Sequence, residues 1–175
     1  WPSAVPGSFV SYCVQISESF VPGNLTGYAI TSTANPLNQP PFDATKLEQI
    51  GRLMTYAYGA SGFNKANLNA SEANAVQAGI WEILYQPVGP AWAGFDLGNG
   101  TFKINGTLTS QMNTVSGWVA GGNLDALTSY QHYQVLSNGG KQDFLVPVPE
   151  PEAYALALAG LGIVGFALRR RSTSH

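Results

Sequence analysis

The sequence predicts an α+β domain with a small antiparallel sheet or sandwich, followed by a tail of a different kind. Strand-like alternation occurs at both ends of the first 146 residues, and helix-like periodicity fills the middle. A proline- and glutamate-rich stretch then precedes an uncharged apolar run and three arginines. We therefore expect a folded domain over residues 1–146, a linker over residues 147–152, and a hydrophobic helix with an arginine cluster over residues 153–175.

Two strands are expected near the N-terminus. Ser8–Ser17 alternates in the manner of a strand, with Cys13 on one face and Tyr12 and Val14 on the other. Gly27–Thr33 is the second strand candidate. Both precede the helical middle of the chain.

Three helices follow, each with apolar residues at helical spacing. Asp43–Tyr58 and Ser71–Gln86 are the clearer two, and Asn69 or Ser71 can cap the second of them. The third helix is expected over Thr109–Ala120, before a pair of glycines.

The C-terminal part of the domain reads as a hairpin. Tyr130–Leu136 and Gln142–Val146 are strand-like and flank the turn signal Asn138-Gly139-Gly140. Thr101–Ile104 is a short strand at best. Strands at both ends of the domain allow the first and last strands to pair.

The composition excludes several classes of function. Charged residues make up only 10 % of the chain and the net charge is −2, so there is no basic footprint for nucleic acid. Cys13 is the single cysteine, which rules out an intramolecular disulfide. The two histidines and the cysteine show no metal-ligand spacing, and no cofactor is expected.

The tail closely resembles the PEP-CTERM sorting signal of Gram-negative bacteria. Pro149-Glu150-Pro151 is followed by the apolar run 153–168 and by Arg169-Arg170-Arg171. The resemblance implies export, transient anchoring in the inner membrane through residues 153–168, and processing near Pro-Glu-Pro by an exosortase. It places the mature protein at the cell surface or in the extracellular matrix. An ordinary membrane anchor would account for the apolar run and the arginines but not for the Pro-Glu-Pro.

Two short motifs resemble bacterial thioester domains. Tyr12-Cys13-Val14 is similar to an aromatic–Cys–aliphatic motif, and Ala75-Val76-Gln77-Ala78-Gly79-Ile80-Trp81 to a helix that carries Gln-x-x-Ile-Trp. The resemblance implies that the Cys13 thiol condenses with the Gln77 carboxamide into an internal thioester. A primary amine of a surface or matrix molecule then attacks this bond and becomes covalently attached, as in adhesion or biofilm assembly.

The shielding of such a bond is also expected from the sequence. A thioester must be kept from water, and Tyr12, Ile80 and Trp81 can provide apolar cover. Two departures from the motifs stand out. Gln15 lies where an acidic residue is expected, and Gly79 replaces a common alanine, where it would allow close approach of the Cys13 strand.

Other interpretations remain. The chain is not expected to be an enzyme, because no carboxylate spacing singles out a glycosidase pair and no nucleophile elbow is present. A passive structural or carbohydrate-associated matrix protein with a buried, unreactive Cys13 is the alternative to amine capture. A lone cysteine in a strand is commonly a small buried apolar residue.

Overall fold

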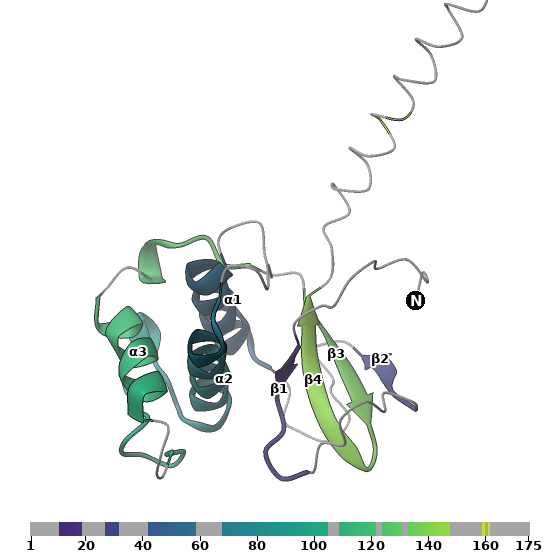
Figure 1. The fold of residues 1–175 in the computed structure, drawn as a ribbon, viewed down its shortest axis with the longest axis horizontal. Coiled ribbons are helices and arrows are strands. Elements are labelled where there is room, and N and C mark those ends of the chain that lie inside the picture. The colour runs from purple at the N-terminus through teal and green to yellow at the C-terminus, as the bar shows by residue number, and fades with distance from the viewer. Residues whose placement is uncertain are drawn as a thin grey trace, which may run out of the picture.

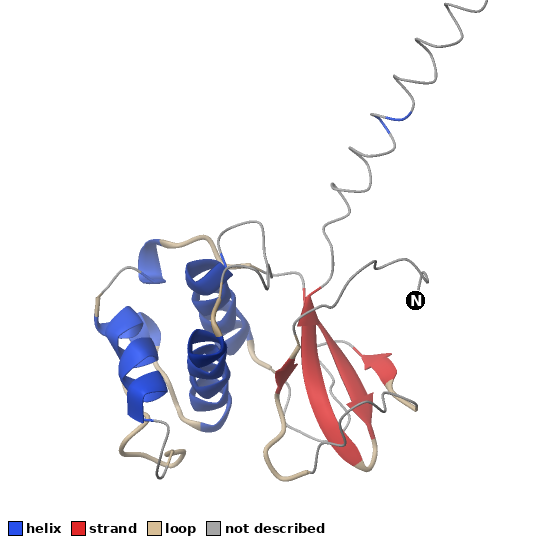
Figure 2. Cartoon of the chain, viewed as in Figure 1, coloured by secondary structure: helices blue, strands red, loops and turns tan. Residues whose placement is uncertain are grey.

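The computed structural model describes residues 11–18, 27–31, 42–58, 68–104, 109–121, 124–130 and 133–147, together with residues 159 and 161. Within these residues the chain forms three α-helices and one four-stranded antiparallel sheet, which confirms the α+β prediction (Figure 1). Figure 2 shows the helices gathered on one side and the strands on the other. Of the two predicted arrangements, the described residues form the sheet and not the sandwich.

The sheet joins the two ends of the domain. Its strands are β1 (Tyr12–Cys13), β2 (Ala29–Thr31), β3 (Tyr133–Asn138) and β4 (Lys141–Pro147). They lie in the order β1-β4-β3-β2, and each neighbouring pair is antiparallel. Cys13 is opposite Phe144 in the ladder. The first and last of the described strands therefore pair, an arrangement that the sequence allowed.

The N-terminal strands are shorter than predicted. Of the described part of Ser8–Ser17, only Tyr12–Cys13 is strand, because the main chain leaves the ladder beyond Val14. The strand predicted over Gly27–Thr33 begins only at Ala29, since Gly27 has a φ of 80° and forms a turn, and residues 32 and 33 lie outside the described residues.

The other strand predictions need smaller changes. The strand predicted over Tyr130–Leu136 lies later in the chain, because β3 begins at Tyr133 and runs to Asn138. Thr101–Ile104 is not a strand. The main-chain N–H groups of Thr101 and Phe102 donate to the side chain of Gln86 instead of a neighbouring strand.

The helices lie close to their predicted bounds, at α1 (Ala44–Tyr58), α2 (Ala70–Tyr85) and α3 (Thr109–Ala120). Asn69 is the N-cap of α2. Its side chain accepts from the Glu72 N–H, and the Glu72 carboxylate accepts from the Asn69 N–H, which forms a capping box. Local sequence signals thus place the start of the helix that carries Gln77.

The main core lies between the helices and one face of the sheet. Its fully buried members include Val14, Leu53, Ile80, Val115 and Leu145. Gly79 lies at the helix crossing, where a Cβ would come within 2.8 Å of a Leu53 methyl carbon and 3.0 Å of one on Val115. The prediction that Gly79 admits the Cys13 strand is therefore wrong, because its missing side chain makes room for α1 and α3.

The predicted sorting helix lies almost entirely outside the described residues. Ala159 and Leu161 are helical and exposed. The residues Pro149, Glu150, Pro151, Arg169, Arg170 and Arg171 are not among those described. In the described part of the chain, no helix has both the length and the apolar character needed to cross a membrane.

Candidate functional site: the contact between Cys13 and Gln77

The structure brings Cys13 and Gln77 into direct contact, although 64 positions separate them in the chain. The main-chain N–H of Cys13 donates to Gln77 Oε1 at 2.8 Å. Gln77 Nε2 donates to the main-chain oxygen of Cys13 at 2.7 Å. Both ends of the carboxamide are therefore held against one residue of β1.

The position of β1 at the edge of the sheet explains this contact. The N–H of Val14 donates to the main-chain oxygen of Asp143 at 3.0 Å and so points toward β4. Because main-chain groups alternate in direction along an antiparallel strand, those of Cys13 point to the open edge. A carboxamide carries the same donor and acceptor as a peptide group. The Gln77 carboxamide therefore makes the two hydrogen bonds to the main chain of Cys13 that a neighbouring strand would otherwise make.

A second side chain of α2 binds the same segment. The hydroxyl of Tyr85 donates to the main-chain oxygen of Val14 at 2.9 Å and accepts from the N–H of Ile16 at 3.3 Å. Gln77, Trp81 and Tyr85 are spaced four residues apart and so share one face of the helix. One stripe of α2 thus holds the N-terminal strand and the residues that follow it.

The side chain of Cys13 lies on the face of the sheet that points away from the helices. Cys13 packs with Tyr28 against a second apolar cluster, formed by Leu136, Phe144 and Val146. Burial raises the pKa of the Cys13 thiol above its ordinary value, because a thiolate loses solvation there. The thiol is therefore protonated at neutral pH.

The predicted shielding residues lie in three different environments. Tyr12 is buried in the main core, where its hydroxyl is hydrogen-bonded to that of Tyr58. Ile80 is fully buried, and Trp81 is half-buried with its ring edge-on to Phe102. Of these three, Trp81 lies on the stripe that carries Gln77.

Sequence reasoning missed Tyr28 and Phe144, two aromatic residues that belong to the same apolar cluster as Cys13. Their rings are 5.7 Å apart between centroids. Phe144 lies opposite Cys13 in the ladder. Only the register between the first and last strands could have identified it, and that register is not a local property of either segment.

Gln15 occupies the position where an acidic residue was expected. Its side chain is 3 % exposed, and within the described residues its Oε1 has no hydrogen-bond partner. Its main-chain oxygen accepts from the Gln142 carboxamide. The group two residues after Cys13 is therefore a neutral, buried amide, which cannot take a proton from the thiol.

Comparison with known proteins concerns the tail alone. Residues 147–171 match the model of the PEP-CTERM protein-sorting motif. This range includes both Pro149-Glu150-Pro151 and the arginine cluster, and it supports an exported protein that is sorted by an exosortase to the cell envelope or surface. No curated protein and no solved structure matches the chain. Among the described residues, no group of three or more His, Cys, Asp or Glu side chains is placed to hold a metal ion.

Proposed function

We propose that this chain is a surface or matrix protein whose domain forms a thioester between Cys13 and Gln77 and captures a primary amine. The observation that supports it is the pair of hydrogen bonds between the Gln77 carboxamide and the main chain of Cys13. Proximity of the two residues that carry the reacting groups favours an intramolecular condensation, because it removes most of the entropic cost of bringing them together.

The contact also suggests how the bond forms. Sγ of Cys13 adds to Cδ of Gln77, and negative charge develops on Oε1. The Cys13 N–H, 2.8 Å away, stabilises this charge in the manner of an oxyanion hole. The C–N bond then breaks, and Nε2 leaves as ammonia with the proton of the thiol. The thiol must turn from its cluster beside Phe144 toward the strand edge for this step.

Capture of the target reverses the roles of sulfur and nitrogen. The nitrogen of the target amine attacks Cδ, the C–S bond breaks, and the thiol regains a proton from the amine. The product is an amide between Gln77 and the target. Each chain reacts once, so this is bond formation without turnover and not enzymatic catalysis.

The sorting tail would bring this domain to its place of action. In our proposal, residues 153–168 anchor the chain transiently in the inner membrane with Arg169-Arg170-Arg171 on the cytoplasmic side. An exosortase then processes the chain near Pro149-Glu150-Pro151. The domain over residues 1–146 is released to the cell surface or the extracellular matrix, where amine-bearing partners are present.

A passive structural role, with or without an associated carbohydrate, is the second candidate, and the same contact favours it. Both polar ends of Gln77 are already used to close the edge of β1. The raised pKa of the Cys13 thiol also lowers its nucleophilicity at neutral pH. In this case the carboxamide is a structural clamp, and Cys13 is a small apolar residue.

Intact-mass analysis of the full chain separates the two candidates. Amine capture requires that the purified chain be lighter by one ammonia, and that methylamine then add to Gln77 and release a thiol that iodoacetamide modifies. The control is Cys13→Ser, which keeps the main-chain hydrogen bonds but has no thiol. An unmodified mass with a freely alkylated Cys13 would rule out the thioester and leave the structural role.

A further inference from the structure

An irregular loop follows α2 and ends beside the stripe of the helix that carries Gln77. It spans residues 87–104 and includes the short 3-10 turn η2 (Pro90–Trp92). All of the loop lies within the described residues, and none of it is strand. Its main-chain groups must therefore find partners outside the sheet, and side chains of α1 and α2 supply several of them.

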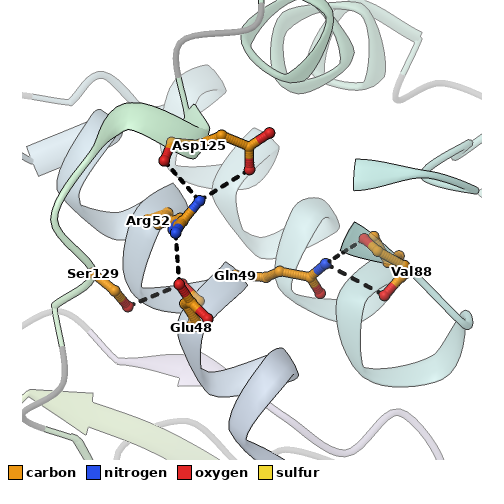
Figure 3. Close-up of polar contacts among 7 residues, drawn as sticks. Glu48, Gln49, Arg52, Val88, Asp125 and Ser129 are labelled. Carbon is orange, nitrogen blue, oxygen red and sulfur yellow. Dashed lines mark hydrogen bonds and ion pairs between the residues drawn. The ribbon is translucent and has the colours of Figure 1, made fainter. Parts of the chain in front are cut away.

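Two buried side chains hold the first half of the loop. Nε2 of Gln49, on α1, donates to the main-chain oxygens of Val88 at 3.3 Å and Gly89 at 2.9 Å (Figure 3). The Glu82 carboxylate, on α2, accepts from the N–H of Asp96 at 2.8 Å. Gln49 is 6 % exposed and Glu82 is fully buried, so water does not compete for these bonds.

Gln86 holds the second half of the loop. Its Oε1 accepts from the N–H groups of Thr101 at 2.7 Å and Phe102 at 3.3 Å, and its Nε2 donates to the main-chain oxygen of Gly94 at 3.4 Å. Gly100 makes room for this carboxamide, because a Cβ there would lie 2.5 Å from Nε2 and 2.7 Å from Oε1. The main chain at Phe102 is therefore fixed relative to the end of α2.

The ring of Phe102 packs on the same stripe of α2. Its centroid lies 6.4 Å from that of Trp81, at an interplanar angle of 64°, and 6.3 Å from that of Tyr85. Nε1 of Trp81 is buried, and within the described residues it has no hydrogen-bond partner. The indole is therefore held by packing alone, and the edge-on contact with Phe102 is part of that packing.

Trp81 lies between the two points at which α2 binds the N-terminal segment. Gln77, one turn earlier, is bonded to the main chain of Cys13, and Tyr85, one turn later, is bonded to that of Val14. Residues four apart on a helix are neighbours on its surface, so the indole flanks the Gln77 carboxamide. Displacement of the indole would open this carboxamide to water.

We propose that Phe102 is a positioning residue, which holds the Trp81 indole beside the acyl carbon of Gln77 and so keeps water from it. The inference rests on the proposed function, in which that carbon becomes part of the thioester. In hydrolysis of the thioester, the water oxygen adds to Cδ, the C–S bond breaks and the sulfur takes a proton. The products are a carboxyl group at residue 77 and a free thiol, and the chain can no longer capture an amine. Phe102 thus prolongs the time for which the thioester can wait for its target.

Exchange of the side-chain amide protons of Gln77 tests this placement without any thioester. The full chain with Cys13→Ser is studied in detergent micelles by nuclear magnetic resonance. Phe102→Leu removes the aromatic edge and should accelerate the exchange about tenfold. Phe95→Leu is the matched control and should leave it unchanged. Phe95 lies on the same loop, is also half-buried, and packs edge-on to a different tryptophan, Trp92, at 5.9 Å.

The lifetime of the thioester is measured in chains that keep Cys13. Intact mass shows the thioester as the loss of one ammonia and its hydrolysis as the later gain of one water. Phe102→Leu should shorten the half-life about tenfold, whereas Phe102→Tyr keeps the ring and should leave it unchanged. Gln86→Ala should also shorten the half-life, because it releases the end of the loop but leaves Phe102 in the sequence.

Two outcomes would overturn the proposal. One is equal exchange at Gln77 in folded Phe102→Leu and Phe95→Leu chains, with Gln86→Ala used in the same way if Phe102→Leu does not fold. The other is a thioester that hydrolyses at the same rate in Phe102→Leu and in the unaltered chain. A chain that forms no thioester contradicts the proposed function instead, and exchange in the Cys13→Ser chains then decides whether Phe102 shields Gln77.

Discussion

Replacing Gln77 with methionine tests the clamp on β1 separately from any chemistry. The substitution is made in a Cys13→Ser background, so that no thioester can form in either protein. Methionine keeps the length of the side chain but removes both hydrogen bonds to residue 13, which measure 2.8 Å and 2.7 Å. What remains is an N–H and a carbonyl at the edge of the strand, partly shielded from water.

The expected loss follows from these two bonds. A hydrogen bond contributes ~0.5–1.5 kcal/mol net, and water can reach part of this half-buried edge, so we expect the free energy of unfolding to fall by about 1–3 kcal/mol. For a domain of this size each kcal/mol corresponds to a decrease in Tm of roughly 2–4 °C. Urea unfolding followed by tryptophan fluorescence gives the difference directly. Hydrogen exchange should accelerate at the amide of residue 13 more than at the amide of Val14, whose partner is Asp143.

A matched substitution on α3 provides the reference. Gln111→Met also removes a carboxamide, and the hydrogen bond that it breaks, with Ser110, is exposed. We expect a change within about 0.5 kcal/mol there. The clamp would be refuted if Gln77→Met were as neutral as Gln111→Met and if the residue-13 amide exchanged at an unchanged rate.

Two further predictions concern packing and buried charge. A Cβ on Gly51 would lie 2.3 Å from the main-chain oxygen of Tyr130, so Gly51→Ala should lower the free energy of unfolding by at least about 2 kcal/mol. A Cβ on Gly117 would have no other atom within 4 Å, so Gly117→Ala should raise the free energy of unfolding by ~0.5–1 kcal/mol. Equal urea midpoints for the two variants would contradict this. Glu82 is fully buried with one oxygen accepting from the Asp96 N–H, and burial raises its pKa above the ordinary 4.5. The folded state therefore holds the Glu82 proton more tightly, and this group makes stability fall as pH rises from 4.5 through its folded pKa. Glu82→Gln should remove that fall. The free energy of unfolding of the variant, measured with urea, should therefore exceed that of the unaltered chain by more at neutral pH than near pH 4.5. A difference that does not grow with pH would count against a buried carboxylate.

The parts of the fold that could be predicted are those encoded locally. The start of α2 follows from Asn69 and Glu72, whose side chains act on the next turn of the same helix. The shared placement of Gln77 and Trp81 on one face follows from helical geometry alone. These properties need no knowledge of the rest of the chain.

The parts that could not be predicted depend on contacts between distant segments. The early strand was overestimated, because its alternation continues past Val14 whereas its main chain is diverted to Tyr85. Gly79 was assigned to the wrong neighbour, since the sequence does not reveal which helices cross at α2. The pairing of Cys13 with Gln77 was inferred from motifs, but its geometry, with the carboxamide on the main chain instead of the sulfur, required the structure.

The strand order has a consequence for the time at which the domain becomes complete. Among the described residues, β1 is the first strand along the chain, but its partner in the sheet is the last, and a contact such as that of Gln15 with Gln142 spans 127 positions. Closing so long a loop is entropically costly, and contacts between distant segments slow folding. β1 must therefore remain unpaired in the sheet until β4 is also available to fold. β4 ends at Pro147, the first residue of the sorting motif, so the sheet can close only when the whole chain up to that motif is available for folding.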